Sequence, residues 1–110
     1  MSQEIEKDLR YSLDDELRSL LPSNWHLYYE PPGGESNIIY PALVYVKTSG
    51  DSKFADNSTY KYDRQYELTC IYEDPDDETP ANILKHFQYC RANRSFVTNN
   101  LHHDTMILYY

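Results

Sequence analysis

Glycine is scarce in this sequence of 110 residues, which contains only three, Gly33, Gly34 and Gly50. A loop that wraps a phosphate group needs several closely spaced glycines, because their backbone approaches the ligand and turns sharply. The three glycines do not stand in such a pattern. The sequence therefore gives no support to a nucleotide-binding loop.

Cysteine is scarce as well, with Cys70 and Cys90 as the only two. They form no C-x-x-C pair, and no histidine stands near either of them at zinc-finger spacing. The histidines also lack the i, i+4 spacing of a helical metal site; they are His26, His86, His102 and His103. We therefore expect no metal and no cofactor. We also expect free thiols in a reducing cytoplasm, with Cys70 as a small residue of the core.

Long apolar runs and common catalytic patterns are missing too. No run approaches the roughly 18 residues that a membrane helix needs, so we expect no membrane contact. No nucleophile-elbow pattern occurs. The acids that crowd one turn, Asp74 to Glu78, fit solvated carboxylates ahead of a helix better than a paired acid and base. We expect no enzymatic activity.

Basic residues are outnumbered: ten Lys and Arg stand against 18 Asp and Glu, which gives a net charge of −8. A surface that binds phosphates needs clustered Lys and Arg, because they displace condensed counterions. Here the bases are scattered and usually stand beside acids, so we expect no direct specific binding of nucleic acid. An acidic inhibitor that mimics DNA remains an alternative, although its acids would have to align on one surface.

Tyrosine, in contrast, is abundant, with 12 residues against three phenylalanines. From Tyr60 to Tyr72 the even positions are mostly aromatic or apolar and the odd positions mostly charged or polar. This alternation predicts a strand with one aromatic face and one charged face. The aromatic face has two interpretations: the core beneath the helices, which we favour, or a contact between subunits.

Hydrophobic periodicity predicts a single α+β domain over residues 1–110. Leucines at steps of three and four predict a helix from Gln3 to Leu20, ended by Pro22. Thr79 and Pro80 fit the N-cap and first position of a second, short helix that fades near Cys90. We expect both helices on one face of a mainly antiparallel sheet of about four strands. The expected strands are Trp25–Glu30, Asn37–Thr48, Tyr60–Tyr72 and Asp104–Tyr110, with a further short strand possible at Ser95–Thr98 before an Asn-Asn turn.

Three stretches carry a family resemblance: IIYPALVY, FADNSTYKYDRQYELTCIYEDPD and HHDTMILYY. Over Ile38 to Tyr110 the chain resembles the tail-completion or tail-terminator proteins of long-tailed bacteriophages, which take part in head–tail joining. The resemblance implies an α+β fold and a hexameric ring that caps the tail tube. The implied partners are other copies of the chain, the tail tube protein and a neck or head-completion protein. The implied location is the host cytoplasm during assembly and then the tail or neck of the virion.

The connection between the second and third expected strands is longer than a tight hairpin needs, and it supplies the candidate contact residues. We expect Phe54, Asp56 and Asn57 of this loop, with Tyr60 and Tyr62 of the strand that follows, to contact a subunit or partner. The alternative is that Phe54 packs back onto its own domain. A head-completion or neck connector protein of the same virion is the alternative function within this class.

Overall fold

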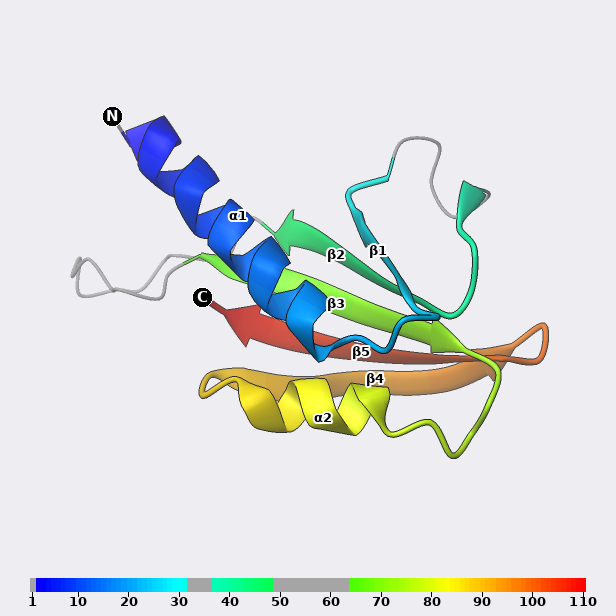
Figure 1. Ribbon diagram of the computed structural model, residues 1–110. Helices are drawn as coiled ribbons and strands as arrows, with labels where there is room; N and C mark the ends of the chain where they lie inside the picture. Colours follow the sequence, from blue (N-terminus) through cyan, green and yellow to red (C-terminus); the bar gives the residue numbers. More distant parts are fainter. Residues whose placement is uncertain (1, 32–36, 49–63) are drawn as a thin grey trace.

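The computed structural model describes residues 2–31, 37–48 and 64–110. These residues form two helices and a five-stranded sheet with the strand order β1-β2-β3-β5-β4 (Figure 1). The expected α+β class is confirmed, with one strand more than expected. The elements, in chain order, are α1 (Ser2–Leu20), β1 (His26–Tyr29), β2 (Ala42–Thr48), β3 (Gln65–Tyr72), α2 (Thr79–His86), β4 (Cys90–Thr98) and β5 (Leu101–Tyr109).

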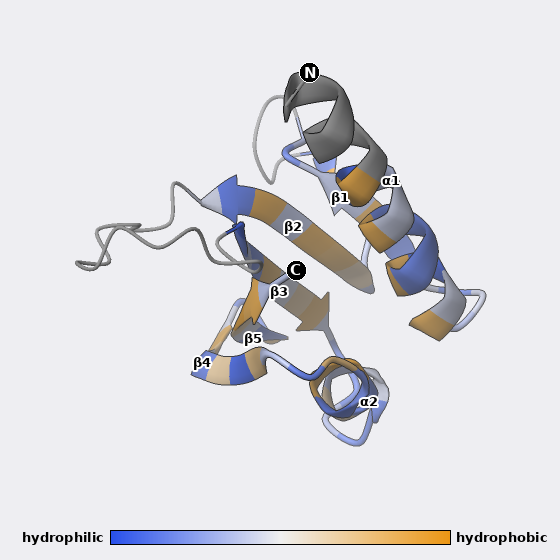
Figure 2. Ribbon diagram, turned by 90° about the vertical axis from the view of Figure 1, so that its left-hand side faces the viewer, coloured by the Kyte–Doolittle hydropathy of each residue, from blue (hydrophilic) through white to orange (hydrophobic). Residues whose placement is uncertain are grey.

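Both helices lie on one face of the sheet, as Figure 2 shows. The pairs β2–β3, β3–β5 and β4–β5 are antiparallel, as expected. The remaining pair, β1 and β2, is parallel, so the sheet is mainly antiparallel, as expected. Parallel neighbours need a crossover connection, and the chain between Tyr29 and Ala42 is long enough to provide one.

The largest departure from the expected strands is β4. The sequence predicted a helix that fades near Cys90 and a short strand at Ser95–Thr98, but α2 ends at His86 and β4 occupies Cys90–Thr98. The predicted Asn-Asn turn explains the longer strand. Asn99 and Asn100 have φ angles of 55° and 64°, the left-handed conformation that two-residue hairpin turns require. This hairpin extends the β4–β5 ladder along both strands, so β5 starts at Leu101 rather than Asp104.

Other strand limits also differ. β2 starts at Ala42 rather than Asn37, because Pro41 has no N–H to donate to a ladder. β1 is shorter than Trp25–Glu30, since Glu30 turns into a positive φ of 43°. The described part of the third strand begins at Gln65, and residues 60–63 of the predicted strand lie outside the described residues.

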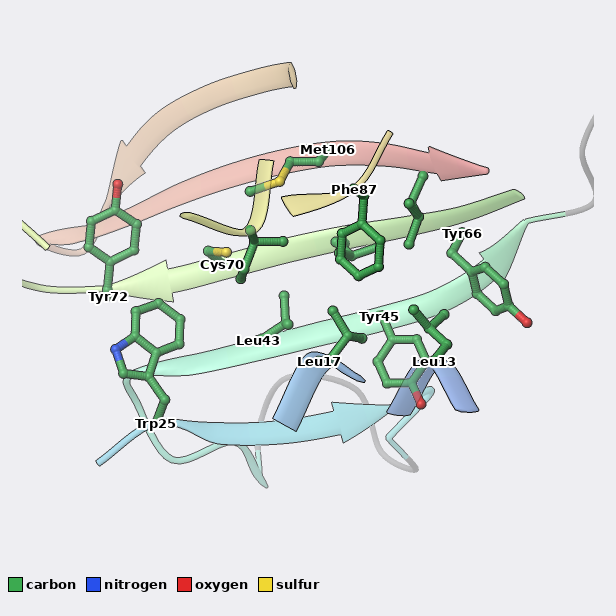
Figure 3. Packing of buried hydrophobic residues seen from close by; sticks show 13 residues of the cluster. Leu13, Leu17, Trp25, Leu43, Tyr45, Tyr66, Cys70, Tyr72, Phe87 and Met106 are labelled. Carbon is green, nitrogen blue, oxygen red and sulfur yellow. The ribbon is translucent and has the colours of Figure 1, made fainter. Parts of the chain in front are cut away.

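The core lies between the helices and the sheet (Figure 3). Leu13 and Leu17 of α1 are fully buried, as the predicted apolar stripe requires. The even positions of β3 alternate into the same cluster, which confirms the core interpretation of the aromatic face for Tyr66 and Tyr72. Cys70 is fully buried there, as expected. The cluster contains Leu13, Leu17, Trp25, Leu43, Tyr45, Tyr66, Leu68, Cys70, Tyr72, Ile83, Phe87, Met106 and Leu108.

The start of α2 corrects a further prediction. The N-cap residue is Glu78 rather than Thr79, and the Glu78 side chain makes no capping hydrogen bond. Instead, the backbone N–H of Thr79 donates to Asp77 Oδ1 at 2.9 Å. The indole Nε1 of Trp25 donates to Asp77 Oδ2 at 3.1 Å, so this carboxylate joins the acidic turn to the core.

Candidate assembly surface

The structure does not test the residues that the sequence predicted to contact a subunit or partner. Phe54, Asp56, Asn57, Tyr60 and Tyr62 lie outside the described residues, and their role stays a prediction. Among the described residues, the candidate contact surface lies on β4, a strand that the sequence predicted only over Ser95–Thr98.

β4 is the last strand in the sheet order, and within the described residues it pairs with β5 alone. Its outer edge therefore presents backbone N–H and C=O groups that no described strand pairs. All of its residues after Cys90 are exposed. An edge strand of this length is a template on which another chain can pair, so folded proteins protect such strands or use them for assembly.

Half of β4 carries the usual protection. The ladder register shifts between Ala92 and Arg94, so a bulge interrupts the strand there, and Arg91 and Arg94 add charge. Bulges and charged side chains both discourage edge pairing. The half from Ser95 to Thr98 has no bulge and no charge, and it is the part of the strand open to a partner.

Two large apolar side chains stand on this unprotected half. Phe96 is 39% exposed and Val97 is 59% exposed. Their pairing partners on β5 are His103 and His102, so the two side chains lie on opposite faces of the sheet. A partner that covered both would remove apolar surface from water on each side of the strand.

On the face away from the helices, Phe96 packs against neighbouring groups of the sheet. Its ring stacks on the ring of buried His103, with centroids 4.7 Å apart and planes 6° apart. The guanidinium of Arg94 lies 5.3 Å from the centroid of the Phe96 ring. The backbone N–H of Arg94 donates to Thr105 Oγ1 at 3.0 Å. These contacts hold Phe96 and Arg94 beside each other on this face.

On the helix side, a groove of about 350 Å³ runs between α2 and β4. Asp104 in this groove is already hydrogen-bonded, since the hydroxyls of Tyr72 and Ser95 both donate to its carboxylate. Burial, and then this contact with Asp104, raise the pKa of Tyr72. The groove is lined by Pro80, Ala81, Leu84, Ala92, Asn93, Arg94, Ser95, Asp104, Thr105 and Met106. This mostly apolar lining suits an apolar side chain of a partner protein.

The two thiols of the chain lie in the described residues. Burial raises the pKa of the Cys70 thiol and raises that of the Cys90 thiol to about 11, so both are protonated and weakly nucleophilic at neutral pH. Within the described ranges, no three His, Cys, Asp or Glu side chains gather where they could hold a metal ion. No described helix is long and apolar enough to cross a membrane.

No protein-family model, no curated protein and no solved structure matches this chain.

Proposed function

We propose that this protein is a structural component of a bacteriophage virion, a tail terminator or tail-completion protein. It assembles with copies of itself into a ring that caps the tail tube and helps to join it to the head. It works in the host cytoplasm during assembly and then stays in the tail or neck. It acts by binding rather than by catalysis. The sequence resemblance supplies the class of virion protein, and the exposed half of β4 supplies the physical support.

That support is the observation that Ser95–Thr98 of β4 is uncharged and exposed, carries Phe96 and Val97, and has no described strand along its outer edge. A protein that worked alone would gain from a charge or a bulge there, as it has at Arg91 and Arg94. A closed ring removes this liability, because each copy covers the exposed surface of a neighbour. A head-completion or neck connector ring would use the same surface, so β4 supports the ring class as a whole.

The surface around β4 gives no support to an acidic DNA mimic. Such an inhibitor needs a continuous acidic surface with phosphate-like spacing. Here the edge strand β4 carries Arg91 and Arg94, and its only neighbour in the sheet contributes two histidines and a single acid, Asp104. Asp104 is held by Tyr72 and Ser95 within the fold.

The test compares two variants that add the same charge at equally exposed aliphatic residues. Val97 on β4 is 59% exposed and Ile39, before β2, is 60% exposed. Purified tail tubes of the phage that encodes the protein are incubated with wild type, Val97→Asp or Ile39→Asp. Binding to the tube ends is measured by sedimentation and electron microscopy. Melting of each variant is recorded alongside.

We expect wild type and Ile39→Asp to bind at one end of the tube. Val97→Asp should melt at nearly the same temperature but lose end binding by about tenfold or more, because a buried unpaired carboxylate costs several kcal/mol. Wild type that does not bind tube ends contradicts the proposed function. Binding by Val97→Asp equal to that of Ile39→Asp removes β4 from it.

A further inference from the structure

Charge is divided unequally along this chain. Residues 79–103, which contain α2, β4 and the start of β5, include three basic residues and no acid. All 18 acidic residues and the other seven basic residues lie elsewhere, so net charge is +3 in this segment and −11 in the rest of the chain. A strongly acidic protein thus has one basic region, and that region includes its exposed edge strand.

Two of the three bases stand on β4 itself. Arg91 pairs with Ile107 and Arg94 pairs with Thr105, so both extend from the face of the sheet that lies away from the helices. Phe96 follows on the same face. No acid of the described residues forms an ion pair with Arg91 or Arg94. Among the described residues, their charge is not neutralised by an acid.

The acids are densest in the turn between β3 and α2, which we call the acidic turn and define as Glu73–Glu78. Five of its six residues are acidic, and four of those five are exposed. Asp77 is held by Thr79 and Trp25, as described above. The turn lies at the end of the sheet where β3 leads into α2, away from the basic half of β4 (Figure 1).

We infer that β4 binds the acidic turn of a second copy of this chain, so that copies join head to tail. This inference rests on the proposed function and specifies the contact between neighbouring subunits. The two surfaces are different parts of the molecule, and repeating such a contact produces a ring when the rotation closes. The opposite charges orient the approach, and burial of Phe96 and Val97 provides the apolar area.

Charge also disfavours the symmetric alternative. Two β4 strands paired with each other would bring two regions of net positive charge together, and like charges in close contact are destabilising. The same surface meeting an acidic turn brings opposite charges together. Electrostatic complementarity therefore selects the head-to-tail arrangement.

The test uses two charge-reversed variants and one control. The first variant is Arg91→Glu/Arg94→Glu on β4. The second is Glu73→Lys/Asp76→Lys in the acidic turn, chosen because neither of these side chains makes a hydrogen bond with another described residue. The control is Lys85→Glu, which reverses an exposed base of α2 in the same segment. Self-association is measured by sedimentation velocity at low and at high salt.

Wild type and Lys85→Glu should self-associate at low salt and lose most of that association at high salt, because salt screens exposed charges. Each doubly reversed variant alone should associate about tenfold or more weakly than wild type. An equal mixture of the two reversed variants should recover association at low salt. In that mixture the unchanged β4 of one variant meets the unchanged acidic turn of the other, so the two variants pair with each other; the turn with two lysines keeps Asp74, Asp77 and Glu78.

Three results would overturn the inference: no association of wild type at low salt, full association of either reversed variant alone, or no recovery in the mixture. Loss of duplex DNA binding by Arg91→Glu/Arg94→Glu, with self-association unchanged, would also overturn it and assign β4 to phosphates instead. Tube-end binding by wild type is measured separately, so the proposed function can stand or fail independently of this contact.

Discussion

Leu13 and Leu17 show how the apolar stripe predicted for α1 packs in the core. Leu13 and Leu17 are fully buried against the sheet, whereas Asp15 between them is exposed. Tyr45 crosses from β2 to the helix, and its hydroxyl donates to Asp14 Oδ2 at 2.6 Å. Burial, together with this hydrogen bond, raises the pKa of Tyr45. The helix is therefore held by leucines on its inner face and by polar contacts at its rim, which include hydrogen bonds of Glu16 with Tyr110 and His86.

Leu17→Ala should lower the free energy of unfolding by about 2–5 kcal/mol, because it removes buried methyl groups and leaves a cavity. Asp15→Ala, two positions away and exposed, should change that free energy by less than about 0.5 kcal/mol. Chemical denaturation of both variants measures the difference. An unchanged denaturation midpoint for Leu17→Ala would show that α1 does not pack on the sheet as described.

The two thiols should differ in accessibility. In Cys90→Ser, Cys70 is the only cysteine, and it is fully buried. A thiol reagent at pH 8 should leave the native Cys90→Ser protein unlabelled and should label it completely in denaturant. The single-cysteine variant Cys70→Ser, which keeps the half-buried Cys90, should label slowly in native buffer. Equal labelling rates of native and unfolded Cys90→Ser would mean that Cys70 is not in the core.

Among the elements, α1 and β4 show what the sequence could and could not reveal. The ends of α1 follow from a leucine stripe and Pro22, and the structure confirms the helix to Leu20. β4 was largely missed because a strand that is exposed on both faces has no apolar alternation to recognise. The only local signal was the Asn99-Asn100 turn, whose geometry sets the register of the whole hairpin.

The start of α2 shows a similar limit. Thr79 has the right chemistry for an N-cap, but the sequence does not show that Trp25, distant in the chain, already holds Asp77 in place. This tertiary hydrogen bond lets Asp77 accept from the N–H of Thr79. Although burial of Asp77 opposes it, hydrogen bonds from Thr79 and Trp25 lower the pKa of this carboxyl below its usual 3.8.

Asp77→Ala should therefore destabilise the protein by about 1–3 kcal/mol, because it leaves the Trp25 and Thr79 donors without their acceptor. Glu78→Ala, at the N-cap position without a side-chain capping bond, should have little effect. Since the pKa of Asp77 is lowered by folding, wild type should also lose this contribution as the pH falls below about 4. Urea denaturation at pH 7 and at pH 3 should show a smaller gap between wild type and Asp77→Ala at pH 3. A gap that stays the same would contradict this role.

At the scale of the whole molecule, the fold class and the core followed from periodicity, while the proposed binding surface did not. A residue's fit to the core depends on its own apolarity and spacing, which the sequence shows directly. A contact between copies depends on which segments the sheet order leaves at an edge, and only the structure shows that β4 is last. The predicted contact residues around Phe54 stay a prediction beside this surface.

The separation of charge is also a property of the whole molecule. A composition with net charge −8 indicates solubility and weak binding to phosphates. Its distribution, with a basic region around β4 and an acidic turn after β3, gives the molecule two unlike surfaces. Two unlike surfaces are what head-to-tail assembly requires.

The central claim is that copies of this chain close into a ring at the end of a tail tube. The most direct measurement is electron microscopy of purified tail tubes incubated with the protein, with averaging of the views along the tube axis. Our account predicts one closed ring at one end of each tube, with neighbouring subunits in contact through β4. Protein scattered along the tube walls, or tube ends that remain bare at saturating protein concentration, would contradict it.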